Sequence, residues 1–263
     1  MQLSEIDYPP RLQAERALNE WCILSGYRGS QAHGMYIPNS DPDSFDDIDI
    51  MAICVPTVEY YYGLKEYGSR GTKEIMDDPW DVVIYEYRKF IRLLSNANPN
   101  VLSMLWLKEY HRLTKAGQLL VDNRMMFSTQ KAYKSFVGYA YSQLKKMTAF
   151  KFEGYMGEKR KSLVRKYGYD CKNASHCIRL LRMGIEFLQT GELTVERPDA
   201  EELLAIKHGS MSLTDVQDMA EGLFVDMKSY GGKCSLPTNP DMDAITQLAI
   251  KIAETHRGES CNA

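Results

Sequence analysis

The architecture of this chain follows from one segment, Gly26-Tyr27-Arg28-Gly29-Ser30-Gln31-Ala32-His33-Gly34, with Asp46-Asp47-Ile48-Asp49-Ile50-Met51-Ala52-Ile53 a short loop later. An apolar lead-in, Trp21 to Leu24, runs into the Gly-Ser turn and predicts a first strand. A second apolar run, from Ile48 to Val55, predicts another strand that begins beside two aspartates. The loop between them is rich in turn-forming residues.

The two aspartates, Asp47 and Asp49, are one residue apart. Residues i and i+2 of a strand project from the same face, so this spacing places their carboxylates side by side. Like charges held that close need a cation between them, and carboxylate oxygens suit Mg²⁺. The turn at Gly29 and Ser30 offers backbone N–H groups and a hydroxyl to a phosphate. We therefore expect a site for a metal-nucleotide.

Either motif alone is common, since a Gly-Ser pair or an Asp-rich loop is usually only a turn, but their order is more informative. The order of strand, Gly-Ser, short loop and Asp-x-Asp strand resembles the DNA polymerase β-like nucleotidyltransferase superfamily. The sequence from Arg28 to Gly34, together with Pro38 and the segment from Asp46 to Asp49, is similar to that of a narrower branch. This branch contains the predicted nucleotidyltransferases found beside RNA ligases and in large phages. The segments 98–106 and 168–182 are similar to that branch as well, so the resemblance extends, with gaps, over residues 27–212.

The resemblance implies a metal-dependent enzyme that moves a nucleoside monophosphate from a nucleoside triphosphate to an acceptor hydroxyl and releases pyrophosphate. It implies Mg²⁺ or Mn²⁺ as the cofactor and an RNA or tRNA end as the acceptor. A protein hydroxyl or a small molecule such as an aminoglycoside is the alternative acceptor, as in other branches of the superfamily. A nucleotide-binding module without turnover is a further alternative, against which the intact pair of acids argues.

Three carboxylates commonly hold the metal ions in the superfamily, and Asp47 and Asp49 are the first two candidates here. Asp81 is the best candidate for the third, because it opens an apolar run that predicts a strand next to the paired acids. Glu86 is the rival at the following strand-to-helix junction. An earlier pair, Asp41 and Asp43, flanks Pro42 and therefore reads as loop.

Further residues are candidates for nucleotide binding. His33 either contacts the triphosphate or ribose or merely packs the turn. Lys172, His176 and Arg179 lie at i, i+4 and i+7 and form one stripe of a helix, separate from the apolar residues around them. The complete predicted nucleotide-binding set is Gly29, Ser30, His33, Lys172, His176 and Arg179, and the predicted catalytic and metal-binding set is Asp47, Asp49 and Asp81.

Composition restricts the class of protein. The chain has 263 residues, of which 44% are hydrophobic and 25% charged, as expected for a folded globular protein. A net charge of −3 argues against coating of nucleic acid through bulk charge, although residues 145–182 are strongly basic. The six cysteines follow neither a disulfide nor a zinc pattern. Neither a signal peptide nor a membrane span is evident, so we expect a cytoplasmic protein without a membrane partner.

The order of predicted elements indicates an α+β protein. A nucleotidyltransferase catalytic domain over residues 1–125 would carry a mixed sheet flanked by helices, and an all-helical domain would follow over residues 126–263. A loop or hairpin is expected over residues 63–78, before a strand at 81–85. Helices are expected at residues 10–21, 86–94, 130–152, 170–189, 199–208, 213–230 and 240–256.

Overall fold

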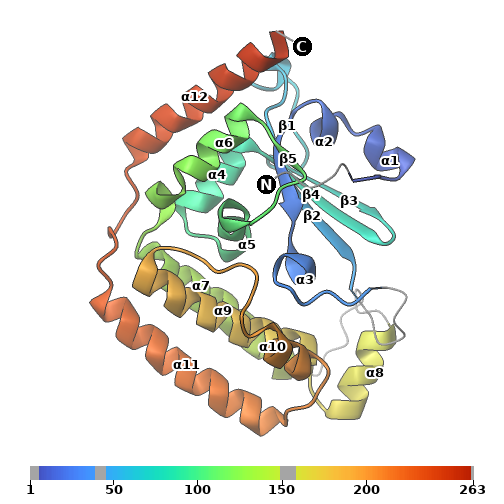
Figure 1. The fold of residues 1–263 in the computed structure, drawn as a ribbon, viewed down its shortest axis with the longest axis vertical. Helices are drawn as coiled ribbons and strands as arrows, with labels where there is room; N and C mark the ends of the chain where they lie inside the picture. Colours follow the sequence, from blue (N-terminus) through green and yellow to red (C-terminus); the bar gives the residue numbers. More distant parts are fainter. Residues whose placement is uncertain (1–5, 39–45, 149–157, 262–263) are drawn as a thin grey trace.

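A five-stranded mixed sheet forms the centre of the N-terminal half, in the order β3-β4-β2-β1-β5 (Figure 1). Strands β2 and β4 are parallel, and every other neighbouring pair is antiparallel. This sheet, followed by a mostly helical region, confirms the predicted α+β class. The structure is a computed structural model that describes residues 6–38, 46–148 and 158–261. The strands are β1 (Cys22–Tyr27), β2 (Ile48–Cys54), β3 (Thr72–Asp77), β4 (Trp80–Glu86) and β5 (Arg112–Leu113).

Strand β2 lies between two hydrophobic layers because its side chains alternate between them. Ile50 and Ala52 belong to a core that includes residues of the N-terminal helices, whereas Met51 and Ile53 belong to the larger core shared with the helical half. All four side chains are buried. A continuous apolar run is what a strand covered on both faces requires, and it accounts for the sequence from Ile48 onward.

The N-terminal helix predicted over residues 10–21 is instead two short helices, so the prediction of one continuous helix was wrong. The chain is extended at Glu15, whose carboxylate accepts a hydrogen bond from the backbone N–H of Ala17. The side-chain amide of Asn19 holds the break by donating to the carbonyls of Leu12 and Gln13. The two helices are α1 (Pro10–Gln13) and α2 (Arg16–Asn19).

Short helical elements connect the strands of the sheet. The hairpin that was one option for residues 63–78 is formed by β3 and β4. The predicted helix over residues 86–94 is also present, one residue later at each end. The connecting elements are α3 (Gly29–Ala32), the 3₁₀ turn η1 (Val58–Tyr60), α4 (Tyr87–Ser95), α5 (Pro99–Leu102), the 3₁₀ turn η2 (Ser103–Trp106), α6 (Lys115–Asp122) and the 3₁₀ turn η3 (Arg124–Phe127).

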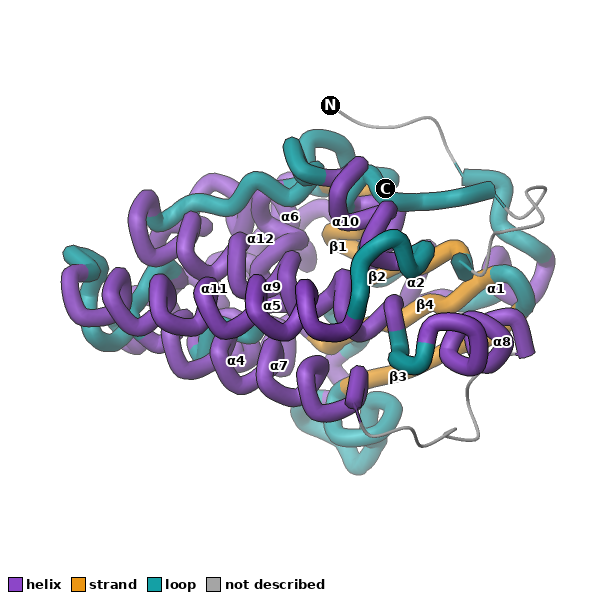
Figure 2. Tube along the Cα trace, turned by 90° about the horizontal axis from the view of Figure 1, so that it is seen from below, coloured by secondary structure: helices purple, strands orange, loops and turns teal. Residues whose placement is uncertain are grey.

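Within the described residues, every element after β5 is helical. Helix α9 lies at the centre of this half and packs against α7, α10 and α11. The axes of α7, α9 and α11 run in nearly the same direction (Figure 1), and Figure 2 shows that helices make up most of this part of the molecule. The predicted helix at 130–152 is present from Lys131 to Thr148, and residues 149–152 of that prediction lie outside the described residues. Helix α8 was not predicted. The helices are α7 (Lys131–Thr148), α8 (Glu158–Tyr167), α9 (Cys171–Thr190), α10 (Ala200–Lys207), α11 (Leu213–Lys233) and α12 (Met242–Cys261).

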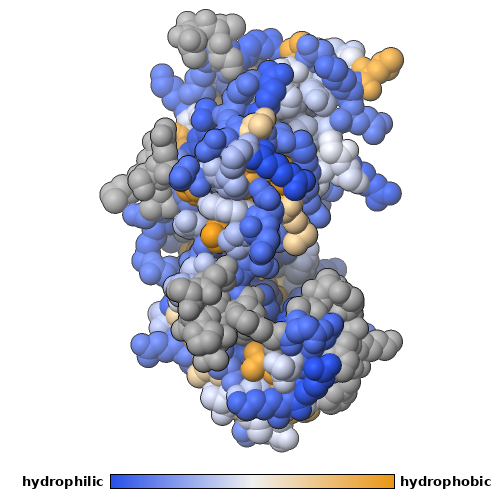
Figure 3. Space-filling view, turned by 90° about the vertical axis from the view of Figure 1, so that its right-hand side faces the viewer, coloured by the Kyte–Doolittle hydropathy of each residue, from blue (hydrophilic) through white to orange (hydrophobic). Residues whose placement is uncertain are grey.

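The last helix, α12, returns to the N-terminal half, where it packs against α6 and α4 (Figure 1). Its buried Ile252 belongs to the same hydrophobic core as Met51 of the sheet. Apolar contacts therefore cross the division between residues 1–125 and 126–263, which remains a prediction. The face drawn in Figure 3 is mostly hydrophilic, with small separate hydrophobic patches. No helix among the described residues is long and apolar enough to cross a membrane.

Candidate active site

A cavity of about 290 Å³ lies at the end of the sheet where β1 ends and where β2 and β4 begin. Its far wall is formed by α9 and the end of α10. Every site residue predicted from the sequence lines this cavity, although the residues come from segments far apart in the chain. They are Gly29, Ser30, His33, Asp47, Asp49, Asp81, Lys172, His176 and Arg179.

The carboxylates of Asp49 and Asp81 lie on neighbouring strands. Asp49 is directly opposite Asp81 in the parallel register of β2 and β4, which places both side chains on one face of the sheet. Asp47 precedes the first residue of β2. The guanidinium of Arg28 lies against both strand-borne acids, with Nη2 2.8 Å from Oδ2 of Asp81 and 3.4 Å from Oδ1 of Asp49.

The negative charges of Asp47 and Asp49 are partly removed from water and repel neighbouring carboxylates. Burial raises the pKa of Asp49 to about 6, and the nearby charges of Asp81 and Asp47 add to this effect while Arg28 opposes it. Burial also raises the pKa of Asp47, and Lys172 opposes that shift. A further cation would relieve this repulsion.

The predicted metal ligands Asp47, Asp49 and Asp81 offer the type of oxygen atom that a divalent metal ion binds. Among the described residues, no three His, Cys, Asp or Glu side chains are already close enough together to form a metal site. Arg28 nevertheless provides a stand-in cation, because its guanidinium contacts two of the three predicted metal ligands. Hard carboxylate oxygens on adjacent strands are the ligands that Mg²⁺ and Mn²⁺ prefer.

The Gly-Ser turn is built against Asp49. Gly29 has a φ of 62°, and a Cβ atom there would lie 2.1 Å from Oδ2 of Asp49, so only glycine fits. The side chain of Gln31 accepts a hydrogen bond from the backbone N–H of Asp49 at 3.1 Å. The hydroxyl of Ser30 is buried and has no hydrogen-bond partner among the described residues. A buried hydroxyl in that state is available to a ligand in the cavity.

His33 links this turn to the helical half. Its Nε2 lies 2.8 Å from Nη1 of Arg179, and its Nδ1 lies 2.8 Å from the carbonyl oxygen of Val195. A guanidinium only donates, so Nε2 accepts and the proton resides on Nδ1. Burial and the adjacent Arg179 hold the pKa of His33 well below its ordinary value. The imidazole is therefore neutral, and it both lines the cavity and packs the turn.

The stripe on α9 faces the cavity rather than solvent. Arg179 is buried, which lowers its pKa to about 10, and its Nε has no partner among the described residues. The ammonium of Lys172 lies 4.0 Å from Oδ1 of Asp46. Burial and the cations Arg179 and Lys172 keep the pKa of His176 well below its ordinary value. The stripe therefore supplies positive charge opposite the acids of the sheet.

Sequence reasoning missed a buried ion pair at the edge of this cavity. The ammonium of Lys207, at the end of α10, lies 2.6 and 2.7 Å from the two carboxylate oxygens of Asp46. This contact ties the helical half to the residue preceding Asp47. One signal was present, because Lys207 continues the apolar stripe of Leu203 and Ile206 at helical spacing.

Glu86, the alternative third carboxylate, lies at the far end of β4, opposite Cys54. Its carboxylate accepts hydrogen bonds from the backbone N–H groups of Arg88 and Lys89 and thereby caps α4. Glu86 does not line the cavity. The earlier pair, Asp41 and Asp43, lies outside the described residues.

A mixed sheet with acids on adjacent strands facing a Gly-Ser turn is the arrangement of a polymerase β-like nucleotidyltransferase. A family model described as RNA repair pathway DNA polymerase beta family, RlaP, matches residues 13–248, and the chain belongs to this family. In the same comparisons no curated protein and no solved structure matched the chain.

Proposed function

We propose that this protein transfers a nucleoside monophosphate from a nucleoside triphosphate to a hydroxyl at an RNA end. In this reaction the acceptor oxygen bonds to the α-phosphorus, the bond from that phosphorus to the bridging oxygen breaks, and pyrophosphate leaves. The observation that carries the proposal is the convergence of Asp47, Asp49 and Asp81 on the cavity that also contains the hydroxyl of Ser30.

Asp47, Asp49 and Asp81 are the residues that would hold Mg²⁺ or Mn²⁺. When bound, such an ion neutralises charge on the phosphates and on the attacking and leaving oxygens. We assign Asp81 a second role, in which its carboxylate accepts the proton of the acceptor hydroxyl. Its position opposite Asp49, at the mouth of the parallel strand pair, supports this role.

The remaining cavity residues bind and orient the triphosphate. The backbone at Gly29 and the free hydroxyl of Ser30 are suited to a phosphate oxygen, because both face the cavity next to Asp49. Lys172 and Arg179 supply positive charge from the opposite wall. His176 is neutral and is a hydrogen-bonding group for the nucleotide. His33 holds Arg179 in place and completes the same wall.

An RNA acceptor is supported by the description of the family, which refers to an RNA repair pathway. The basic segment provides a second argument, since α8, which packs against α9, carries Lys161, Arg165 and Lys166. Contacts from lysine and arginine to phosphates position a nucleic acid strand.

Incubation of the purified protein with each α-³²P-labelled triphosphate and Mg²⁺ tests the proposal. Total RNA, a protein lysate and an aminoglycoside serve as separate acceptors. We expect label on RNA together with release of pyrophosphate, and loss of both in the Asp49→Asn variant. Label on protein alone would reject the RNA acceptor, and binding of triphosphate without pyrophosphate release would reject transfer altogether.

A further inference from the structure

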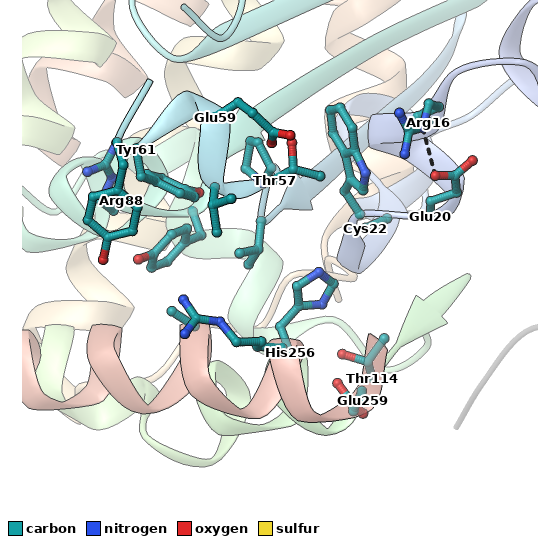
Figure 4. A pocket seen from close by; sticks show the side chains of 18 of the residues that line it. Arg16, Glu20, Cys22, Thr57, Glu59, Tyr61, Arg88, Thr114, His256 and Glu259 are labelled. Atoms are coloured by element: carbon teal, nitrogen blue, oxygen red, sulfur yellow. Dashed lines mark hydrogen bonds and ion pairs between the residues drawn. The ribbon is translucent and has the colours of Figure 1, made fainter. Parts of the chain in front are cut away.

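A second and larger cavity, of about 1050 Å³, lies at the opposite end of β2 (Figure 4). It is enclosed by the start of β1, the η1 segment, the start of α4 and one face of α12. Asp49 is near the first residue of β2 and Val55 follows the last, so at roughly 3.3 Å per residue the two cavities are about 20 Å apart. None of the residues used in the proposed reaction lines this second cavity.

Aromatic side chains form much of its wall: Trp21, Tyr61, Tyr62 and Tyr87. Two of the rings are covered by guanidinium groups, with Arg88 4.3 Å from the ring centre of Tyr61 and Arg16 4.8 Å from that of Trp21. Tyr62 is 86% exposed at the rim. Flat rings and guanidinium planes are the surfaces on which nucleobases stack, and the exposed ring of Tyr62 is accessible for such stacking.

The same cavity offers positive charge for an anionic group. Arg16 and Arg88 are paired with carboxylates at 2.7 and 2.9 Å. Arg112 and Arg257 also line the cavity, and neither forms an ion pair with any residue that the structure describes; Nε of Arg112 donates to the carbonyl of Cys22 at 2.8 Å, which leaves its two terminal nitrogens for a ligand. A guanidinium without a carboxylate partner is well suited to bind a phosphate through two parallel hydrogen bonds.

Helix α12 adds a hydrogen-bond acceptor to the aromatic rings and arginines of this cavity. One carboxylate oxygen of Glu259 accepts from the backbone N–H of Lys115 at 3.0 Å. The other, Oε2, is buried and has no hydrogen-bond partner among the described residues. His256, one turn earlier, projects into the cavity (Figure 4), and burial lowers its pKa, which keeps it neutral near pH 7. An unpaired carboxylate oxygen at such a place requires a donor, which a ribose hydroxyl provides.

We propose that this cavity binds a nucleotide unit. The base stacks on the aromatic wall near Tyr62, the phosphate contacts Arg112 and Arg257, and a ribose hydroxyl donates to Glu259. The unit is either a free mononucleotide or one nucleotide of a single-stranded RNA, which share this chemistry. Binding here is independent of transfer at the first cavity.

Photo-crosslinking locates the bound nucleotide directly. The full-length protein is irradiated with 8-azido-AMP or with a 5′-phosphorylated oligoribonucleotide containing 8-azidoadenosine, and the labelled peptides are identified. We expect label in peptides that contain Tyr62 or His256, in addition to any label near Gly29. Label confined to peptides of the first cavity would overturn the proposal.

Two variants measure the contribution of exposed residues at the rim. Tyr62→Ala and Arg257→Ala remove one stacking and one phosphate contact without disturbing the core, and each should weaken labelling of the second cavity about tenfold. Leu64→Ala and Lys251→Ala are matched controls, since both residues are exposed and neither lines the cavity.

The two probes distinguish the source of the nucleotide. Equal affinity for 8-azido-AMP and for the oligonucleotide identifies a free-nucleotide site, and tighter binding of the oligonucleotide identifies a site for RNA. Variants that bind like their controls would contradict the assignment.

Discussion

Nη2 of Arg28 lies 2.8 Å from Oδ2 of Asp81, on the face of the sheet that Asp81 shares with Asp49. The arginine immediately before the Gly-Ser turn thus offsets part of the negative charge of two of the carboxylates that we assign to metal binding. A guanidinium in this place competes with a metal ion for the same oxygens. Displacement of Arg28 would leave it adjacent to the turn at Gly29 and Ser30, where the triphosphate is expected to bind.

Replacement of Arg28 tests this competition. We expect Arg28→Met to bind Mn²⁺ more tightly than the parent protein in the absence of nucleotide, because the competing cation is gone. Titration followed by the electron paramagnetic resonance of free Mn²⁺ measures the change. Arg11→Met, which alters an exposed arginine away from the cavity, is the control. Weaker Mn²⁺ binding by Arg28→Met would show that the arginine supports the acids rather than competing for them.

Asp49→Asn should remove activity and stabilise the fold in a pH-dependent manner. The pKa of Asp49 is raised in the folded protein to about 6, so ionisation of this group opposes folding as the pH rises from about 4 to 6. The variant should therefore match the parent near pH 4 and exceed it above pH 6 by up to about 3 kcal/mol, at about 1.36 kcal/mol per pKa unit. Denaturant unfolding at several pH values measures the difference, and a constant difference would contradict the assigned pKa shift.

A comparison of Gly29 with Gly34 distinguishes the effect of backbone strain from the effect of contact with Asp49. Gly29 and Gly34 have φ values of 62° and 70°, so alanine strains both positions, at a cost of about 1 kcal/mol. The new Cβ at Gly34 meets nothing closer than 3.5 Å, whereas at Gly29 it lies 2.1 Å from Oδ2 of Asp49. We expect Gly29→Ala to lose metal binding and Gly34→Ala to retain it, although both variants carry the same backbone strain. Equal Mn²⁺ affinities would show that the close approach to Asp49 has no role.

The bond between His33 and Arg179 predicts a loss of stability in acid. The pKa of His33 is lowered on folding, so the stability it contributes is present above about pH 6.5 and is lost as the pH falls below that value. His33→Gln keeps an acceptor for Arg179 and does not titrate. Between pH 7 and 5 the variant should therefore lose less stability than the parent protein. An unchanged pH dependence of unfolding would mean that folding does not lower the pKa of His33.

Local sequence order was enough to predict one side of the active site. The Gly-Ser turn and the pair at Asp47 and Asp49 lie close together in the chain, and the strand that begins at Asp81 does pair with β2. Alternating polar and apolar residues, or continuous apolar runs, predict strands because they indicate which faces of a strand are buried. The same reasoning predicted the main helices of the second half.

The helical stripe of Lys172, His176 and Arg179 on the opposite wall was predicted as well, but the contacts that hold this wall against the sheet depend on packing that no local pattern specifies. The contact of His33 with Val195 and the ion pair of Asp46 with Lys207 join segments more than a hundred residues apart. The break near Glu15 was missed because side-chain hydrogen bonds from Asn19 override a helical pattern. The second cavity escaped prediction for the same reason, since α12 reaches the sheet only in the folded chain.

Mn²⁺ binding by single-residue variants tests whether Asp49 and Asp81 hold the metal ion. Mn²⁺ affinity should be measured by calorimetry, with a nonhydrolysable triphosphate present, for the parent protein, Asp49→Asn and Asp81→Asn. Asp77→Asn is the matched control, because Asp77 lies on neighbouring β3 and does not line the cavity. We expect at least a tenfold loss of affinity, about 1.4 kcal/mol, for Asp49→Asn and Asp81→Asn, and no loss for the control. Parent-like binding by both Asp49→Asn and Asp81→Asn would contradict this assignment.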